Sequence, residues 1–349
     1  MHFVELAERK LGSGHPCFVI AEAGVNHNGD LNQAKELVRQ ARQAGADCVK
    51  FQTFKAERVV TASAPKAAYQ LKVTDPVESQ FAMLRKLELS ESDHRVLIDQ
   101  CQREGILFLS TPYSMEDAEM LHALGVPSFK IASGQLVELP FLAALARFNK
   151  PVILSTGMAT FDETREAVAT LRDHGCNQIV VLQCTTNYPS RIADTNLRAM
   201  AGIAAATGAL IGYSDHTEGI SACLASIALG ACVVEKHFTL DRNLPGPDHR
   251  CSSEPTELTA LVRGIREVEA ALGDGVKQPT AAELANLTGM RRSIVATRLI
   301  KAGTTVTAAD FAFKRPATGL APKRLGELLG RKALLDLPAD SQVLLEHFA

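Results

Sequence analysis

The sequence predicts a closed barrel of eight parallel strands surrounded by helices, the (β/α)8 class of α/β fold, followed by a small β-rich domain. Three observations lead to this prediction. From residue 17 onward, short apolar runs alternate with amphipathic stretches, as in chains that build a parallel sheet covered by helices. The apolar runs are nearly continuous, which is typical of strands buried on both faces. There are eight of them, and this number favours closure into a barrel over an open sheet.

The predicted strands are, in order, residues 17–24, 48–52, 106–111, 128–133, 152–157, 178–184, 210–215 and 231–238. Between them, apolar residues recur at i, i+3 and i+4, which predicts amphipathic helices, and several of these stretches end at glycine as a helix C-cap does. The clearest predicted helices are residues 32–45, 91–105, 140–149, 161–175 and, after the eighth strand, 254–273. No G-x-G-x-x-G follows the first strand, which argues against a dinucleotide-binding sheet.

The character of the sequence changes after residue 273. Residues 274–290 are typical of a linker, and residues 291–349 carry short β-like pieces separated by Gly and Pro turns. We therefore expect a barrel over residues 1–273, a linker over 274–290 and a second compact domain over 291–349.

The composition restricts the class of partner. With 46% apolar residues, 22% charged residues and a net charge of −2, the chain resembles a soluble globular protein and lacks the positive charge of a nucleic-acid-binding one. Its eight cysteines form no C-x-x-C pair, MHFVELAERK at the start contains no apolar leader, and the longest uncharged run, 220–234, is too short to span a bilayer. We expect a cytoplasmic protein with neither a nucleic-acid nor a membrane partner.

Polar residues occur where the predicted strands end. In a TIM barrel the active site lies at the C-terminal ends of the strands, so these residues should meet around one mouth. In strand order they are Glu22, Lys50, Gln52, Ser110, Thr111, Lys130, Ser133, Gln135, Ser155, Thr156, Thr185, Thr186, Asn187, Tyr188, Ser214, Asp215, His216, Glu235, Lys236 and His237. Their coincidence at all eight strand ends predicts a site rather than an inert barrel.

The residue types point to two kinds of ligand. His216 and His237, on neighbouring strands, could share one divalent ion, and a structural histidine pair is the alternative. Lys50 and Lys130, surrounded by hydroxyl groups, could hold a phosphate or a carboxylate. The alternative for each lysine is a surface residue whose stem covers apolar neighbours.

The segment GYSDHTEG, residues 212–219, has two interpretations. Its polar residues either cap the following helix, with Asp215 or Thr217 at the N-cap, or face the site. The later strand ACVVEKHFTL also ends in charged and histidine residues, which favours the second interpretation, that these residues face a site. Asp215 itself would either orient His216 or cap the helix.

Eight segments resemble the sialic acid synthase family. They are AEAGVNHNGD, KFQTF, STPYS, FKIASG, LSTGMAT, CTTNYP, GYSDHTEG and EKHFTLDRNLPGPDH. The later segment RRSIVATRLIKAGTTVTAADFAFKRPATGL resembles the antifreeze-like (SAF) domain that follows the barrel in those enzymes. The resemblance extends from residue 17 to the end, and APKAAYQ, residues 64–70, is most similar to the bacterial branch that includes legionaminic acid synthases.

The resemblance implies a reaction. Enzymes of this family condense phosphoenolpyruvate with an N-acyl hexose and water, giving a nonulosonic acid and phosphate. For this chain the sugar would be N-acetylmannosamine or a 2,4-diacetamido-trideoxy hexose. A divalent metal, Mn²⁺ or Mg²⁺, would be held by His216 and His237, and the active form would be a homodimer.

The resemblance also implies individual roles. Glu22 would lie close to the metal and handle the proton of the reacting water. Phosphoenolpyruvate would be held by Lys50, Thr111, Lys130, Ser133, Ser155 and Ser214, and the sugar by Gln52, Tyr188 and Asp248. Arg315, in the small domain, would reach into the active site of the partner subunit, so that each small domain completes the other's site.

Two positions depart from the family pattern. Relatives usually carry a carboxylate where this chain has Gln135, and many sialic acid synthases carry asparagine where it has Thr186, with Asn187 next to it. Because buried polar partners determine which substrate group is recognised, these departures leave the sugar open but not the reaction.

Two other functions remain open at this point. A Schiff-base aldolase on the same barrel would use Lys130 or Lys236 with free pyruvate. A non-catalytic binding protein would use the antifreeze-like domain and leave the barrel inert, although an inert barrel has no need of polar strand ends.

Overall fold

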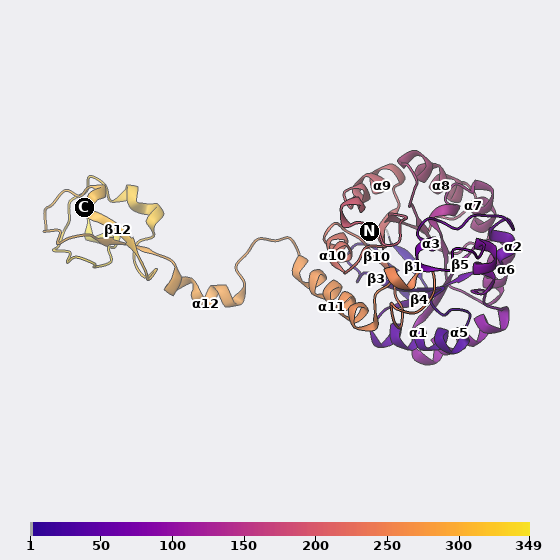
Figure 1. Ribbon diagram of the computed structural model, residues 1–349. Helices are drawn as coiled ribbons and strands as arrows, with labels where there is room; N and C mark the ends of the chain where they lie inside the picture. Colours follow the sequence, from indigo (N-terminus) through magenta and orange to yellow (C-terminus); the bar gives the residue numbers. More distant parts are fainter. Residues whose placement is uncertain (1–2) are drawn as a thin grey trace. The chain divides into compact units, whose positions relative to one another are not determined.

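Eight parallel strands form the centre of the first part of the chain. They are β3 (Phe18–Gly24), β4 (Cys48–Thr53), β5 (Leu107–Pro112), β6 (Phe129–Ile131), β7 (Val152–Ser155), β8 (Ile179–Cys184), β9 (Leu210–Asp215) and β10 (Val233–His237). Their hydrogen-bonded order is β5-β4-β3-β10-β9-β8-β7-β6, and β5 and β6 at its two ends lie side by side. The sheet is a nearly closed barrel ringed by helices (Figure 1), which confirms the predicted fold class.

The structure is a computed structural model that describes residues 3–349. It divides into two compact units, one ending at Gly273 and the other beginning at Asp274.

Seven of the longer helices connect successive barrel strands, and an eighth follows the last strand. They are α1 (Leu31–Gln43), α5 (Glu91–Glu104), α6 (Met115–Ala123), α7 (Leu139–Ala146), α8 (Phe161–Asp173), α9 (Ala199–Thr207), α10 (Ser221–Ala228) and α11 (Pro255–Leu272). Local sequence signals fix their ends: a capping box between Ser90 and Asp93 begins α5, and left-handed Gly105 (φ 70°) ends it. The connection from β4 to α5 is longer and contains three short helices, α2 (Ala56–Val59), α3 (Gln70–Val73) and α4 (Gln80–Arg85).

The alternation of side chains along each strand creates two apolar layers. On β3, Val19 and Ala21 point outward and pack with helix residues such as Leu37, whereas Phe18 and Ile20 point into the barrel. Every residue of β3 is buried, which is why its sequence reads as a continuous apolar run.

A hairpin that the sequence did not reveal fills one end of the barrel. Strands β1 (Val4–Leu6) and β2 (Arg9–Leu11) pair antiparallel. Their buried side chains Val4, Leu6 and Leu11 pack with the inward residues near the strand beginnings, such as Phe18. In Figure 1, β1 lies over the centre of the ring. The opposite end, where the strands finish, is left for a site.

The second unit has its own core. Strands β11 (Ser293–Ala296) and β12 (Phe311–Lys314) pair antiparallel, and their apolar residues join others, such as Ile300 and Val343, in one buried cluster. The segment expected to be a linker is only partly irregular, because α12 (Ala281–Met290) occupies its second half. A capping box between Thr280 and Glu283, in the sequence TAAE, starts that helix and could have been read from the sequence.

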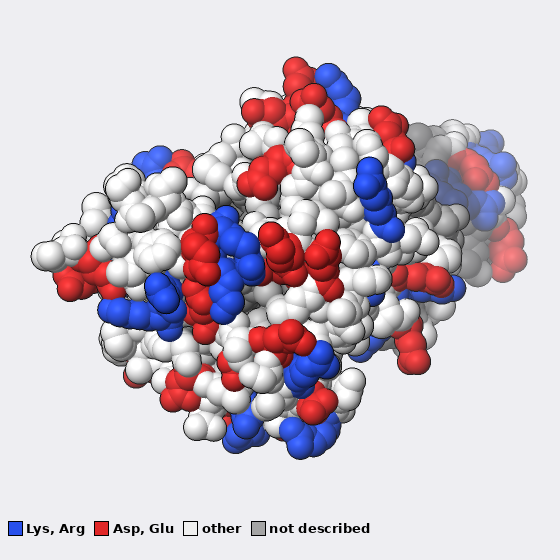
Figure 2. All heavy atoms as spheres, turned by 90° about the vertical axis from the view of Figure 1, so that its right-hand side faces the viewer, with Lys and Arg blue, Asp and Glu red and all other residues white. Residues whose placement is uncertain are grey.

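The surface carries charges of both signs. On the face shown in Figure 2, acidic and basic side chains are intermixed, as expected for a chain of net charge −2. Within residues 3–349, no helix combines the length and apolar character that crossing a bilayer requires.

Candidate active site

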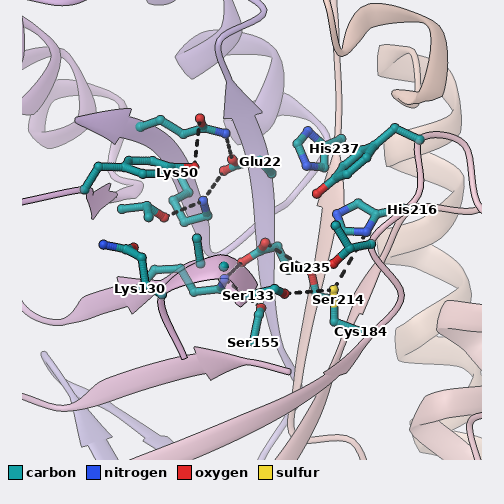
Figure 3. Close-up of a pocket in the computed structure, with 18 of the residues that line it drawn as sticks. Glu22, Lys50, Lys130, Ser133, Ser155, Cys184, Ser214, His216, Glu235 and His237 are labelled. Atoms are coloured by element: carbon teal, nitrogen blue, oxygen red, sulfur yellow. Dashed lines mark hydrogen bonds and ion pairs between the residues drawn. The ribbon is translucent and has the colours of Figure 1, made fainter. Parts of the chain in front are cut away.

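Inward-facing side chains change from apolar to charged along each strand. On β3 the inward series is Phe18, Ile20 and Glu22, and on β10 Glu235 is followed by His237. The apolar members fill the barrel below, and the polar members line a cavity of about 360 Å³ at the strand ends (Figure 3).

This cavity brings together all but two of the residues that the resemblance singles out. Its lining contains Glu22, Lys50, Gln52, Thr111, Lys130, Ser133, Gln135, Ser155, Thr186, Tyr188, Ser214, His216 and His237. Of the polar strand-end residues, those that do not line it are Ser110, Thr156, Thr185, Asn187, Asp215 and Lys236. Asp248 lines a neighbouring cavity instead. Arg315 lies in the second unit, where it is exposed and its Nε donates a hydrogen bond to the carbonyl oxygen of Met290 at 3.0 Å.

One side of the cavity is organised around Lys50. Its ammonium lies 2.7 Å from Glu22 Oε2 and donates to Thr111 Oγ1 at 3.0 Å. Gln52 Nε2 donates to the other Glu22 oxygen at 3.2 Å. These groups come from the adjacent strands β3, β4 and β5, so the barrel register itself holds them together.

The facing side is organised around Lys130. Its ammonium donates to Ser155 Oγ at 2.8 Å and lies 3.6 Å from Glu235 Oε2. Ser214 Oγ donates to the other Glu235 oxygen at 3.3 Å. Sequence reasoning placed Glu235 at a strand end without a role, although its position two residues before His237 puts both side chains on the inward face.

The two lysines and two carboxylates are buried and shift one another's pKa values. Burial raises the pKa of Glu22 to about 7, against the opposing charge of Lys50. Burial also lowers the pKa of Lys130. For Glu235 burial acts in the raising direction, but the nearby Lys130 and Lys50 outweigh it and lower the pKa. The pocket therefore carries two lysines whose charges are balanced by carboxylates, and one of these carboxyl groups, Glu22, can exchange a proton near neutral pH.

The two histidines lie next to each other at the rim. The centroids of the His216 and His237 rings are 5.2 Å apart, and the Tyr188 ring lies 4.2 Å from that of His216. The Nδ1 of His216 faces the carbonyl oxygen of Thr185 at 2.8 Å, so this nitrogen carries a proton, and in the neutral ring Nε2 keeps a lone pair.

The state of the two rings bears on whether they fit a divalent cation. Burial lowers the pKa of His237 well below its usual range, so this ring is neutral, and its buried Nδ1 has no hydrogen-bond partner in the part of the chain that the structure describes. Among residues 3–349, no group of three or more His, Cys, Asp or Glu side chains forms a ready-made metal cluster. The two adjacent imidazoles are the donors that would hold such an ion.

Several polar groups in the wall lack partners. Both side-chain polar atoms of Gln135 and Oγ1 of Thr186 are buried and have no hydrogen-bond partner among the described residues. An unsatisfied buried polar group costs about 1–3 kcal/mol, so groups of this kind in a cavity wall indicate ligand positions.

Two interpretations of the segments GYSDHTEG and EKHFTL are wrong, because some of their side chains point outward from the barrel. Lys236 is fully buried and pairs with Asp215 at 2.7 Å, away from the cavity, so it is not a Schiff-base lysine of this site. Asp215 and Thr217 do not cap a helix either, because α10 begins at Ser221 with Ile220 at its N-cap.

Asp215 instead joins three elements. Its carboxylate accepts hydrogen bonds from the Tyr213 hydroxyl, the Thr217 backbone N–H and the Cys223 thiol on α10, in addition to Lys236. Lys236 also donates to the carbonyl oxygen of Thr217. The pair thus fastens β9 to β10 on the side opposite His216 and His237.

Comparison with known proteins supplies an independent view of the chain. The model of the NeuB family matches residues 37–277, and the model of the SAF domain matches residues 291–349. N,N'-diacetyllegionaminic acid synthase of Campylobacter jejuni is 46% identical over 327 residues, which cover 93% of this chain and 98% of that protein. The enzyme of the same name from Legionella pneumophila is 43% identical and covers 96% of both chains.

A solved structure agrees with these matches. The N-acetylneuraminic acid (sialic acid) synthetase of Leptospira borgpetersenii, crystallised with citrate, superposes with a TM-score of 0.72 at 33% identity. The superposition covers 82% of this chain and 95% of that one.

Proposed function

Because the chain belongs to the NeuB family, we propose that it condenses phosphoenolpyruvate with an N-acyl hexose and water, giving a nonulosonic acid and phosphate. The observation that carries the proposal is the buried pairing of Lys50 with Glu22 and of Lys130 with Glu235 in one cavity. Two buried lysines beside several hydroxyl groups suit a substrate that carries both a phosphate and a carboxylate.

The chain's own residues would act as follows. Lys50 and Lys130 neutralise the phosphate and carboxylate while C3 of phosphoenolpyruvate forms a bond to the aldehyde carbon of the sugar. Water then adds at C2, and the C2–O bond breaks to release phosphate. Glu22 exchanges the proton of this water, for which a pKa of about 7 is suitable.

A divalent cation, Mn²⁺ or Mg²⁺, is part of the proposal. His216 and His237 would hold it, and when bound it would supply Lewis-acid polarisation of the sugar's aldehyde oxygen. The hydrogen bond from His216 Nδ1 to Thr185 supports this role, since it orients the ring and leaves Nε2 free.

We also propose a homodimer in a reducing cytoplasm. Three strongly exposed apolar side chains, Val137, Met158 and Ile192, follow the neighbouring strands β6, β7 and β8 at the cavity end, as a surface covered by another subunit would. Arg315 of the partner subunit would complete the sugar site. All eight cysteines are free, which is usual for a reducing compartment.

The decisive assay measures phosphate release from phosphoenolpyruvate with a panel of N-acyl hexoses. Release that depends on a sugar, with a nonulosonic acid as the second product, is expected. No release with any sugar would favour the non-catalytic alternative. Borohydride trapping of the chain on pyruvate at Lys130 would instead favour a Schiff-base aldolase.

Removal of the metal should abolish turnover. Treatment with EDTA is expected to stop phosphate release and Mn²⁺ to restore it. His237→Ala should weaken Mn²⁺ binding at least about tenfold in calorimetry, because even partners outside the ligand set contribute that much. A wild type that remains fully active in EDTA would refute the metal role.

Gly157→Ala should disrupt one wall of the anion site. A methyl group at Gly157 would lie 2.0 Å from Thr186 Oγ1 and 2.8 Å from Ser133 Oγ, so both side chains must move. A shift of about 1 Å in a positioning group can cost roughly 100-fold in rate, and we expect a loss of that order in kcat/KM for phosphoenolpyruvate. Gly289→Ala on α12 is the control, since a methyl group there meets nothing within 4 Å and Gly289 does not line the cavity. Equal kinetics for the two variants would contradict the prediction.

Gln135→Glu should change sugar choice more than phosphoenolpyruvate binding. The substitution restores the carboxylate that relatives usually carry and removes a hydrogen-bond donor from the wall. We expect the ratio of kcat/KM between two N-acyl sugars to change by roughly tenfold or more, with a KM for phosphoenolpyruvate near that of the wild type. A uniform loss with every sugar would show that Gln135 is only structural.

A further inference from the structure

The loop after β3 carries a fully buried asparagine that the proposed mechanism does not use. Asn26 is 0% exposed and does not line the cavity, although Glu22, four residues before it, does. Its side-chain amide donates two hydrogen bonds, to the carbonyl oxygen of Phe238 at 2.9 Å and to Ser252 Oγ at 2.9 Å. These acceptors stand 212 and 226 positions later in the chain. Asn26 therefore joins the end of β3 to the segment that follows β10.

The first of these bonds holds the residue directly after His237. Strands β3 and β10 pair in parallel with His237 opposite Glu22, and the Phe238 N–H donates to the carbonyl oxygen of Glu22 at 2.9 Å. The carbonyl oxygen of Phe238 accepts from Asn26. Both main-chain polar groups of Phe238 are thus bound to the segment that contains Glu22. His237 cannot shift along β10 without breaking one of these bonds.

Support for His237 from the other neighbouring strand ends before it. The pairing of β10 with β9 runs as far as Lys236, which lies opposite Asp215. Beyond that point the carbonyl oxygen of His237 accepts a hydrogen bond from the Ser253 N–H at 2.8 Å. The position of His237 therefore depends on β3 and on the segment around Ser253. Asn26 binds next to both, at Phe238 and at Ser252.

The orientation of the Asn26 amide is fixed by its partners. A carbonyl oxygen can only accept, so the amide nitrogen must be the atom that faces Phe238. The amide oxygen, Oδ1, is then buried and has no hydrogen-bond partner among the described residues. An unsatisfied buried acceptor destabilises a fold, so stability alone does not account for an asparagine at this position. What the asparagine supplies is one nitrogen that donates to Phe238 and to Ser252 at once.

We propose that Asn26 is a positioning residue that fixes His237 relative to Glu22 (Figure 3). Resting on the proposed function, the inference is that Asn26 sets the separation between the carboxyl group that exchanges the proton of the reacting water and one of the two imidazoles that would hold the cation. Asn26 acts through Phe238 and touches neither substrate. Partners outside the ligand set that orient a ligand typically contribute about 10–100-fold to metal affinity or activity.

The test replaces the amide by an apolar side chain of similar shape, Asn26→Leu. Mn²⁺ binding to the metal-free protein, measured by calorimetry, should weaken about 10–100-fold. At saturating Mn²⁺, kcat for phosphate release should still fall, because Glu22 and His237 would no longer be held at their wild-type separation. The KM for phosphoenolpyruvate should stay near that of the wild type, since Lys50 and Lys130 come from β4 and β6.

Ser252→Ala is the matched control. It removes the other acceptor of the same amide and leaves the bond to Phe238 in place. Both variants leave a buried polar group unpaired, so both should unfold at a lower urea concentration than the wild type. Ser252→Ala should nevertheless bind Mn²⁺ as tightly as the wild type. Equal Mn²⁺ affinities in Asn26→Leu and Ser252→Ala would overturn the inference, because Asn26 would then only stabilise the loop.

A smaller substitution covers the case in which Asn26→Leu does not fold. Asn26→Ser ends one bond before the position of the amide nitrogen, so its hydroxyl falls short of the carbonyl oxygen of Phe238, and the same loss of Mn²⁺ affinity is expected. Wild-type affinity in Asn26→Ser would refute the positioning role alone. A wild type that neither binds Mn²⁺ nor releases phosphate would overturn the proposed function itself.

Discussion

Lys236→Met is expected to lower the free energy of unfolding by about 3–5 kcal/mol, although Lys236 lies outside the cavity. The reason is the carboxylate of Asp215 that would remain buried on the outer side of β9. Removing one member of a buried ion pair leaves an uncompensated charge, and this is the cost typically measured. The ammonium and the carboxylate are 1% and 0% exposed, so water cannot replace the missing partner.

The double variant Lys236→Met/Asp215→Asn separates charge from shape. With both charges removed, much of the lost stability should return, because neutral replacement of a buried pair is far less costly than breaking it. Urea unfolding followed by circular dichroism measures both variants. Lys35→Met on helix α1, a half-buried lysine without an ion pair, should change stability by no more than about 0.5 kcal/mol. A loss for Lys236→Met no larger than that would show that the pair does not fasten β9 to β10.

The fold could be predicted because the spacing of apolar residues differs between strands and helices throughout the barrel. The run CFVIAEAG, for example, is buried on both sides and has no helical period, and β3 occupies it. The hairpin of β1 and β2 could not be found in this way. Its strands have three residues each and carry exposed charges such as Arg9 and Lys10. Their apolar residues can be recognised as core residues only once the closed barrel that buries them is known.

The site could be predicted as a set because strand ends of a parallel barrel converge. What the set did not contain was the direction of each side chain. Glu235, Lys236 and His237 stand together in the sequence, but the alternation along a strand sends Lys236 outward and its neighbours inward. Counting in steps of two from His237 would have shown that Glu235, and not Lys236, faces the cavity with it.

Mixing two inactive proteins, Arg315→Ala and His216→Ala, is expected to restore about a quarter of the wild-type activity after subunit exchange. The prediction follows from the proposal that Arg315 of the partner subunit completes each site. Random exchange makes about half of the dimers mixed. In each mixed dimer, one site has His216 and receives an intact arginine, while the other site carries both lesions.

The chemistry of the Arg315 side chain determines what we expect when Arg315 alone is replaced. A guanidinium donates several hydrogen bonds in a fixed fork, which an ammonium cannot reproduce, so Arg315→Lys should rescue poorly. Because Arg315 is exposed in its own unit, Arg315→Ala should leave the unfolding transition unchanged while impairing use of the sugar.

Two controls make the mixing experiment decisive. Subunit exchange is demonstrated by native mass spectrometry of the mixed sample. A mixture of His216→Ala with His237→Ala should remain inactive, because each site would still lack one of its own histidines whichever subunit lies opposite. If the Arg315→Ala and His216→Ala mixture stays inactive despite proven exchange, each arginine serves its own chain and the shared site is refuted. Recovery near a quarter, confined to that mixture, requires that the arginine cross the subunit boundary.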